Sequence, residues 1–483
     1  MVILSIFYAV SCALLIAALY FRPSFFIVVC SVFLFLGFAA KLFAHQVFDV
    51  TLIEPTGYFD GTAQAWERAL SLSAAGLTGC LVAVLLGAIL RHKRRPEIKL
   101  RKQLRRHGLF IYALSWMTAI IVFVVGYHFS ILKMGVLPTI ELNPRIYVPV
   151  AFTMSWGAIL WLLSLTTWLV TEKRLSPVSI FYVGAIEGSL AAVAIGSRVQ
   201  MILHLLAATL LYFSYRAFFG WRLRYSQWVK VFALSATLFG ISIAAVTLDR
   251  ALSFPSMYAE MHAPSTGNPV ESKIGSGCAA DETLKRHQDH RSINNPNLLA
   301  LNELKGAEFQ SALLCRLQPL LRELQNLIIM RWVGLEGIMV TSSTSMIRSP
   351  DLFWSAIVEK DQGVNSLYQR MARTRYFEHP KFAFMTVPGP LAVLSYSGSP
   401  IVVFFGMLML FLVGFAIERY AFFATQNPGA EAVTGTAMAY LLVQMMFPRT
   451  LVAAAVLFLF ALTCIAAFRF YFRASSEIHS TTS

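Results

Sequence analysis

Runs of about twenty apolar residues recur along this chain, and each could cross the roughly 30 Å hydrocarbon core of a bilayer as a helix. Such runs constrain the fold because only helices and closed barrels satisfy every backbone hydrogen bond inside lipid. Of the 483 residues, 57% are hydrophobic and only 13% are charged, whereas soluble domains carry roughly 25% charged residues. The pattern therefore predicts an all-α, polytopic integral membrane protein with about 11 transmembrane helices and one large, helical external insert.

The first predicted span lacks the basic region and the small-residue cleavage site of a signal peptide, so we interpret it as a helix. The predicted spans are Val2–Tyr20, Phe25–Phe43, Ala69–Leu90, Leu109–His128, Tyr147–Val170, Val178–Gly196, Val199–Phe219, Val231–Val246, Ile401–Glu418, Val433–Phe447 and Leu451–Phe468.

A dense basic cluster, from Arg91 to Arg106, fixes the orientation, because cytoplasmic loops are enriched in Lys and Arg. The same cluster could bind nucleic acid, but the apolar runs on both sides favour a topology anchor. Counting spans from this anchor places Lys173 and Arg174, residues 216–230 and Arg469 on the cytoplasmic side. The N-terminus and the polar window 249–386 then face outward.

Three parts follow from this pattern. Residues 1–248 form an N-terminal transmembrane bundle, 249–386 an external, mostly helical insert, and 387–483 the helices that complete the same bundle. The insert holds nearly equal numbers of acidic and basic residues, so the net charge of +15 belongs to the membrane portion. That charge reports topology, and no nucleic-acid partner is expected.

Inside the insert, the polar stretch 265–297 predicts a loop. Leucines at three- and four-residue spacing over 313–328 predict an amphipathic helix. Ser349, Pro350 and Asp351 predict a further helix start.

Two cysteines of the insert, Cys278 and Cys315, could form a disulfide in an outward compartment or remain free thiols, and both states stay open. His287 and His290 lie close in sequence, but two histidines without further ligands favour a solvated loop over a metal site.

Arginines at the outward ends of spans oppose the positive-inside trend and need a reason. Arg198 follows Gly196-Ser197 at a predicted outer turn, Arg449 follows Phe447-Pro448, and Arg331 opens the stretch Arg-Trp-Val-Gly-Leu-Glu-Gly. A guanidinium suits bidentate contact with phosphate, while snorkelling to lipid headgroups is the alternative. For Arg145, in a short outer loop, snorkelling is favoured.

Other ionisable residues in or near the spans are candidates by default. Glu187 lies mid-span, where a buried carboxylate could pair with an arginine or be held neutral, and His204 lies a turn or two from Arg198. Either residue could be purely structural, and we favour a structural role for Glu187. Glu336 could instead form an internal ion pair that caps a turn, and His379 is a possible proton acceptor.

Several segments resemble bacterial Wzy-type oligosaccharide repeat-unit (O-antigen or exopolysaccharide) polymerases. They are Gly196–Arg198, Arg331–Gly337, Ser395–Ser399 and Phe447–Arg449, together with the many spans and one large late insert. The resemblance implies a GT-C-like glycosyltransferase at the outer face of the bacterial inner membrane. It would transfer the growing chain from undecaprenyl diphosphate onto a new lipid-linked repeat without metal or cofactor.

Carried onto this chain, the resemblance makes Arg198 and Arg331 the catalytic ligands of the lipid pyrophosphate, with Arg449 third. Glu336 and His379 are the candidate bases that take the acceptor proton. The expected partners are the undecaprenyl-diphosphate-linked oligosaccharide and the bilayer, with a polysaccharide chain-length regulator as a further candidate.

Three other functions stay open. An O-antigen ligase shares the outer arginines and the large outer loop. A flippase or other lipid-linked-sugar transporter would favour broken helices in matched halves, and no internal repeat is visible. A structural or assembly protein is the remaining alternative.

Overall fold

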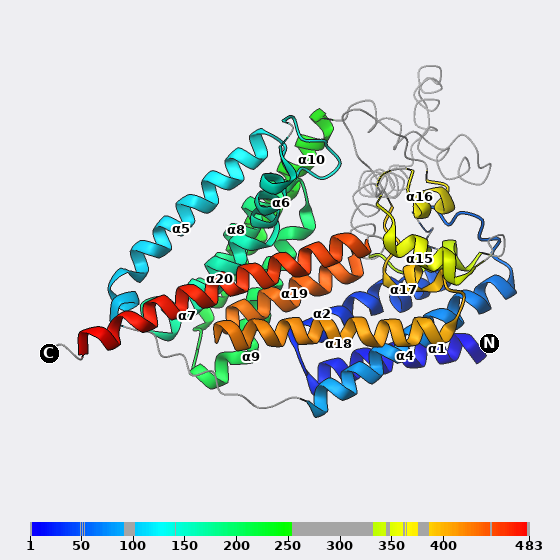
Figure 1. The fold of residues 1–483 in the computed structure, drawn as a ribbon, viewed down its shortest axis with the longest axis horizontal. Coiled ribbons are helices and arrows are strands. Elements are labelled where there is room, and N and C mark those ends of the chain that lie inside the picture. The colour runs from blue at the N-terminus through cyan, green and yellow to red at the C-terminus, as the bar shows by residue number, and fades with distance from the viewer. Residues whose placement is uncertain are drawn as a thin grey trace, which may run out of the picture. The chain divides into compact units, whose positions relative to one another are not determined.

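The computed structural model describes residues 2–48, 50, 52, 54–90, 102–140, 142–253, 332–343, 348–360, 363, 365–374, 386–444 and 447–480. All regular structure in this part of the chain is helical (Figure 1). The helices before the insert are α1 Val2–Phe21, α2 Phe25–Leu34, η1 Phe35–Ala40, α3 Lys41–Phe48, α4 Ala63–Ile89, α5 Lys102–His128, α6 Pro144–Phe152, η2 Thr153–Gly157, α7 Ala158–Thr171, α8 Ser179–Ile195, α9 Arg198–Phe219 and α10 Tyr225–Ser253. The later helices are α14 Leu335–Ser342, α15 Pro350–Val358, α16 Leu367–Ala372, α17 Pro390–Ser395, α18 Pro400–Thr425, α19 Pro428–Gln444 and α20 Pro448–Ser480.

Within the described residues, 9 helices are long and apolar enough to cross a membrane. They coincide with nine of the predicted spans, which confirms a polytopic helical membrane protein. The other two predicted spans fall on α8 and α19, which have 17 residues each. A 17-residue helix is about 26 Å long, slightly shorter than the bilayer core.

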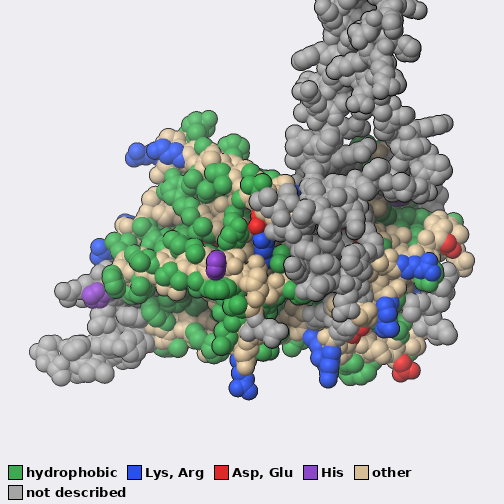
Figure 2. All heavy atoms as spheres, turned by 90° about the horizontal axis from the view of Figure 1, so that it is seen from above, with side chains coloured by type: hydrophobic (Ala, Val, Ile, Leu, Met, Phe, Trp, Pro, Cys, Tyr) green, Lys and Arg blue, Asp and Glu red, His purple; other side chains and the backbone are tan. Residues whose placement is uncertain are grey.

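The outer surface of the bundle is apolar. Phe110 of α5, Phe232 of α10 and Phe460 of α20 are 70%, 77% and 69% exposed. Soluble proteins rarely expose such contiguous apolar area, whereas lipid contact requires it. Figure 2 shows apolar side chains over much of the visible face, with Lys and Arg mostly toward its margins.

Helix α19 is the most enclosed element. Every residue from Pro428 to Gln444 except Leu441 is buried, because α2, α18, α9 and α7 pack around it. A helix shielded from lipid can carry polar side chains, and α19 contains Glu431 and Gln444. That polarity explains why the apolar run in the sequence begins at Val433, five residues after the helix does.

Two predicted spans are continuous in space but contain π-helical turns. The second span runs α2–η1–α3, and the fifth runs α6–η2–α7. A π-turn widens a helix and is frequent at functional sites. In this chain each π-turn meets a buried polar cluster.

The chain divides into two compact units, Met1–Asp249 with Trp332–Ser483, and Arg250–Arg331. The last part of the predicted insert therefore belongs to the same unit as the apolar helices. The first helix in that last part of the insert, α14, is buried over all eight residues and packs against α17 and α4.

Candidate functional site

The first polar cluster surrounds the turn between α8 and α9. Gly196 ends α8 with a φ of +67°, a left-handed conformation that favours glycine. Ser197 occupies the N-cap position of α9 without a side-chain capping hydrogen bond, and Arg198 is the first residue of that helix. The Arg198 guanidinium donates from Nη2 to Thr247 Oγ1 of α10 over 2.7 Å. The two-residue turn makes α8 and α9 antiparallel and sets Arg198 at the end of the bundle.

A second cation lies at the same turn. The Lys133 ammonium lies 2.7 Å from Asp249 Oδ1 and is only 9% exposed. Its aliphatic stem packs against Gly196, and the neighbouring Met134 amide donates to Ile195 O over 2.7 Å. Asp249 follows Thr247 by two residues on α10. The cluster therefore combines Lys133 from the α5–α6 loop, Arg198 from α9 and Asp249 from α10.

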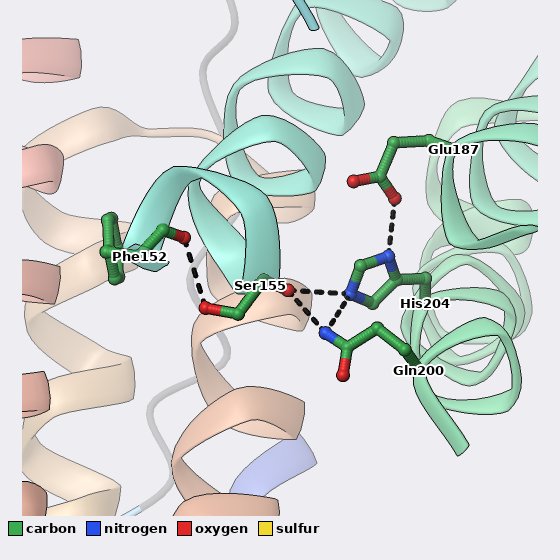
Figure 3. A network of polar contacts seen from close by, with 5 residues as sticks. All are labelled: Phe152, Ser155, Glu187, Gln200 and His204. Atoms are coloured by element: carbon green, nitrogen blue, oxygen red, sulfur yellow. Dashed lines mark hydrogen bonds and ion pairs between the residues drawn. The ribbon is translucent and has the colours of Figure 1, made fainter. Parts of the chain in front are cut away.

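The second cluster is a buried network in the middle of the spans (Figure 3). His204 of α9 directs Nδ1 to Glu187 Oε2 of α8, and its Nε2 lies 3.0 Å from the carbonyl oxygen of Ser155 in η2. The Gln200 amide nitrogen donates to the same carbonyl and lies 2.8 Å from His204 Nε2. Glu187 and His204 are fully buried. The sequence left open whether the mid-span carboxylate of Glu187 has a partner, and in the structure that partner is His204.

The third cluster joins the insert to the second span. Lys41, at the end of η1, donates from Nζ to both carboxylate oxygens of Glu336 over 2.8 Å and to Trp332 O over 2.6 Å. Lys41 and Glu336 are 1% and 3% exposed. The pair holds the start of α14 inside the bundle and gives Glu336 a buried cationic partner.

Packing accounts for the rest of this segment. Trp332 stacks on Phe33 at 5.1 Å between ring centroids, and the Val333 amide donates to Gln444 Oε1 over 2.9 Å. The backbones of Gly37 and Gly334 touch: a Cβ on Gly37 would lie 2.3 Å from Val333 O. Trp332, Val333 and Gly334, which lead into α14, therefore pack against α2 and η1, whereas Gly337 within α14 approaches the backbone of Pro388.

A fourth cluster lies at the ends of the spans opposite to the α8–α9 turn. Both oxygens of the buried Glu418 carboxylate accept from the first amides of α2, Phe25 N over 2.9 Å and Phe26 N over 2.6 Å. A helix N-terminus carries unpaired N–H groups and partial positive charge, so this carboxylate acts as its cap. Glu431 nearby accepts from Tyr215 over 2.6 Å.

The structure does not bring the predicted site residues together in one place. Arg198 belongs to the first cluster, at the α8–α9 turn, and Glu336 to the third cluster, at the start of α14. Arg449 is exposed in the first turn of α20, and Arg145 is exposed in the first turn of α6. The predicted site residues Arg331 and His379 lie outside the described residues. The same holds for Cys278, Cys315, His287, His290 and the helix predicted over 313–328.

Sequence reasoning missed several members of these clusters. Lys41 carried a clear signal, since a lysine within a predicted apolar span needs a partner. Gln200 and Lys133 carried none, because a glutamine near a span end and a loop lysine are common. In the part of the chain that the structure describes, no three His, Cys, Asp or Glu side chains gather as a metal site would require.

Comparison with known proteins supplies no relative. No family model, no curated protein and no solved structure matches this chain.

Proposed function

We propose that this chain polymerises undecaprenyl-diphosphate-linked oligosaccharide repeats at the outer face of the bacterial inner membrane. The observation that carries the proposal is the pair of cations at the α8–α9 turn, Arg198 and Lys133, beside the positive end of a helix. In the proposed topology the chain crosses the membrane eleven times, α8 and α19 being the two short crossings, and residues 249–386 lie outside.

The electrostatics of the turn suit a lipid diphosphate. A cation in the first turn of a helix opposes the helix dipole, so Arg198 and the α9 N-terminus would both gain from an anion. Lys133 adds a second charge, which Asp249 partly offsets. As the glycosidic bond to the diphosphate breaks, charge develops on the leaving oxygen, and positioned cations stabilise it.

The other roles are assigned by the resemblance. Arg331 and Arg449 complete the diphosphate site, and Glu336 or His379 takes the proton of the acceptor hydroxyl. Glu336 already accepts from Lys41 through both oxygens, so accepting a proton there would compete with that ion pair. We therefore favour His379 as the base and Glu336 as the residue that fixes α14.

A gene deletion tests the proposal most directly. Loss of the polysaccharide ladder on a gel, with single repeats retained on the lipid A core, is the expected result. An unmodified core would instead indicate a ligase or a flippase, and a normal ladder would exclude all three functions.

Site variants sharpen the test. Arg198→Ala should lower polymer yield roughly 10- to 100-fold, since a charged hydrogen bond contributes about 1.5–3 kcal/mol. Arg198→Lys should recover part of the loss. Arg145→Ala, at an exposed arginine on the same predicted side, is the control and should leave the ladder unchanged. Full activity of Arg198→Ala at normal expression would refute the site.

A transporter of lipid-linked sugar is the second candidate. The π-turns η1 and η2 interrupt two spans beside buried ionisable side chains, Lys41 and His204. Irregular backbone at such a site is typical of transporters. An unmodified core in the deletion strain, with lipid-linked repeats accumulating inside, would favour this function.

A further inference from the structure

The hydrogen bonds around His204 determine where its proton lies. The Ser155 carbonyl can only accept, so the Gln200 nitrogen that faces it is the amide NH₂. The second hydrogen of that NH₂ faces His204 Nε2 at 2.8 Å. Nε2 therefore accepts, and the ring proton sits on Nδ1, directed at Glu187 Oε2. In this arrangement the pair shares one proton and carries a net charge of about −1.

The same network already holds a place for a second proton. Ser155 O lies 3.0 Å from His204 Nε2, so a protonated Nε2 could donate to it without movement of the backbone. Glu187 Oε1 is buried and has no hydrogen-bond partner among the described residues. A buried carboxylate oxygen without a hydrogen bond carries an uncompensated desolvation penalty. With two protons the pair is neutral overall.

Few charges nearby could compensate the one-proton state. Glu187 is the only ionisable Asp, Glu, Lys, Arg or His in α8, and α7 and η2 contain none. Trp156 faces the His204 ring at 5.2 Å, and Tyr440 of α19 packs against Trp156. On α9, Arg198 bonds Thr247. The ionisable residues of α5 stand toward its ends, and Glu431 of α19 bonds Tyr215.

A polar line on α9 leads from the outer turn to this pair. Ser197, Gln200 and His204 are all buried, and their spacing of three and four residues puts them on one helix face. Buried Asp, Glu and His side chains form proton relays in membrane proteins, and this polar line ends at such a Glu–His pair.

We propose that Glu187 and His204 form a proton-binding site inside the bundle, which takes up one proton at His204 Nε2. On uptake, Nε2 exchanges its bond from Gln200 for a bond to Ser155 O, and release reverses the exchange. The proton comes from outer water along the Ser197–Gln200 face, and no covalent bond between heavy atoms changes. The site is independent of the proposed polymerase activity.

Nitrogen NMR of the full chain in lipid nanodiscs, with ¹⁵N-labelled histidine, tests the site, since imidazole nitrogens report tautomer and charge separately. His204→Gln identifies the signal. If that variant does not fold, Gln200→Met identifies it by a shift while keeping the ring. We expect an Nδ1–H tautomer at high pH and a doubly protonated ring at low pH.

The isosteric variant Glu187→Gln should remove this transition or displace it by more than one pH unit, roughly a tenfold change in proton affinity. His128, which is exposed at the end of α5, is the control and should titrate alike in both proteins. A His204 signal that keeps one form from about pH 5 to 8, or a transition indifferent to Glu187→Gln, would overturn the proposal.

Discussion

Lys41 and Glu336 illustrate how a single buried charge constrains its neighbour. Removing one partner of a buried ion pair leaves the other uncompensated and costs about 3–5 kcal/mol, whereas replacing both with apolar residues of similar size is often neutral. Lys41→Met should therefore strongly lower the thermal stability of the purified protein. Lys41→Met combined with Glu336→Met should recover most of it, as measured by unfolding in detergent.

The double variant also separates structure from chemistry. If it is stable and still makes polymer, the charges serve only to hold α14. If it is stable and inactive, one of the two charges acts in the reaction. Equal stability of the single and double variants would contradict the ion pair itself.

Glu418 makes a second prediction for a single side chain. It accepts from two amides at the start of α2, and an amide side chain in its place can accept through only one oxygen. Glu418→Gln should therefore destabilise the protein by about 1–3 kcal/mol, measured by thermal unfolding. Glu67→Gln, at an exposed position on α4, is the control, and an equal effect in both variants would argue against the cap.

At the scale of elements, the approach of α14 to η1 depends on two glycines. A Cβ on Gly37 would lie 2.3 Å from Val333 O, and one on Gly334 would lie 2.5 Å from Gly37 O. Backbone cannot yield as a flexible side chain does, so Gly37→Ala should destabilise by about 1–3 kcal/mol through overpacking.

A matched variant lies in α10. A Cβ on Gly240 would meet nothing within 4 Å, and Ala is the better helix former by about 1 kcal/mol. Gly240→Ala should therefore leave stability unchanged or raise it, in the same unfolding assay. A Gly37→Ala protein as stable as Gly240→Ala would show that α14 does not dock against η1 in this way.

The sequence predicted elements well where lipid dictates composition and poorly where protein surrounds them. Apolar length located nine of the long helices because each must face hydrocarbon. The same criterion misplaced the start of α19, since a helix enclosed by others tolerates Glu431. It could not locate η1 or η2, because apolar length does not distinguish a π-helical turn from an α-helical one.

The site was predictable only in part, for a similar reason. Arg198 and Glu187 stand out because charge is rare in apolar runs. Their partners, Thr247 and His204, come from other parts of the chain, and a single sequence carries no signal that joins them. Lys41 with Glu336 is the extreme case, since 295 residues separate them.

At the scale of the whole molecule, the polymerase proposal depends on which side of the membrane the α8–α9 turn faces. Positive-inside alternation puts the start of α4 outside and the start of α10 inside. Thr62 and Ser226 are exposed at these two ends. With the six native cysteines replaced, a membrane-impermeant thiol reagent should label Thr62→Cys in spheroplasts. It should label Ser226→Cys only after the membrane is permeabilised.

The opposite labelling pattern would put Arg198 and Lys133 at the cytoplasmic end of the bundle, because α9 begins on the side where α4 begins. A lipid diphosphate presented at the outer face could not then reach them, and the polymerase proposal would fail. The proton site would survive, since its hydrogen bonds do not depend on orientation, but its polar line would open to the cytoplasm. Labelling of both positions in spheroplasts would instead indicate a wrong number of crossings between α4 and α10.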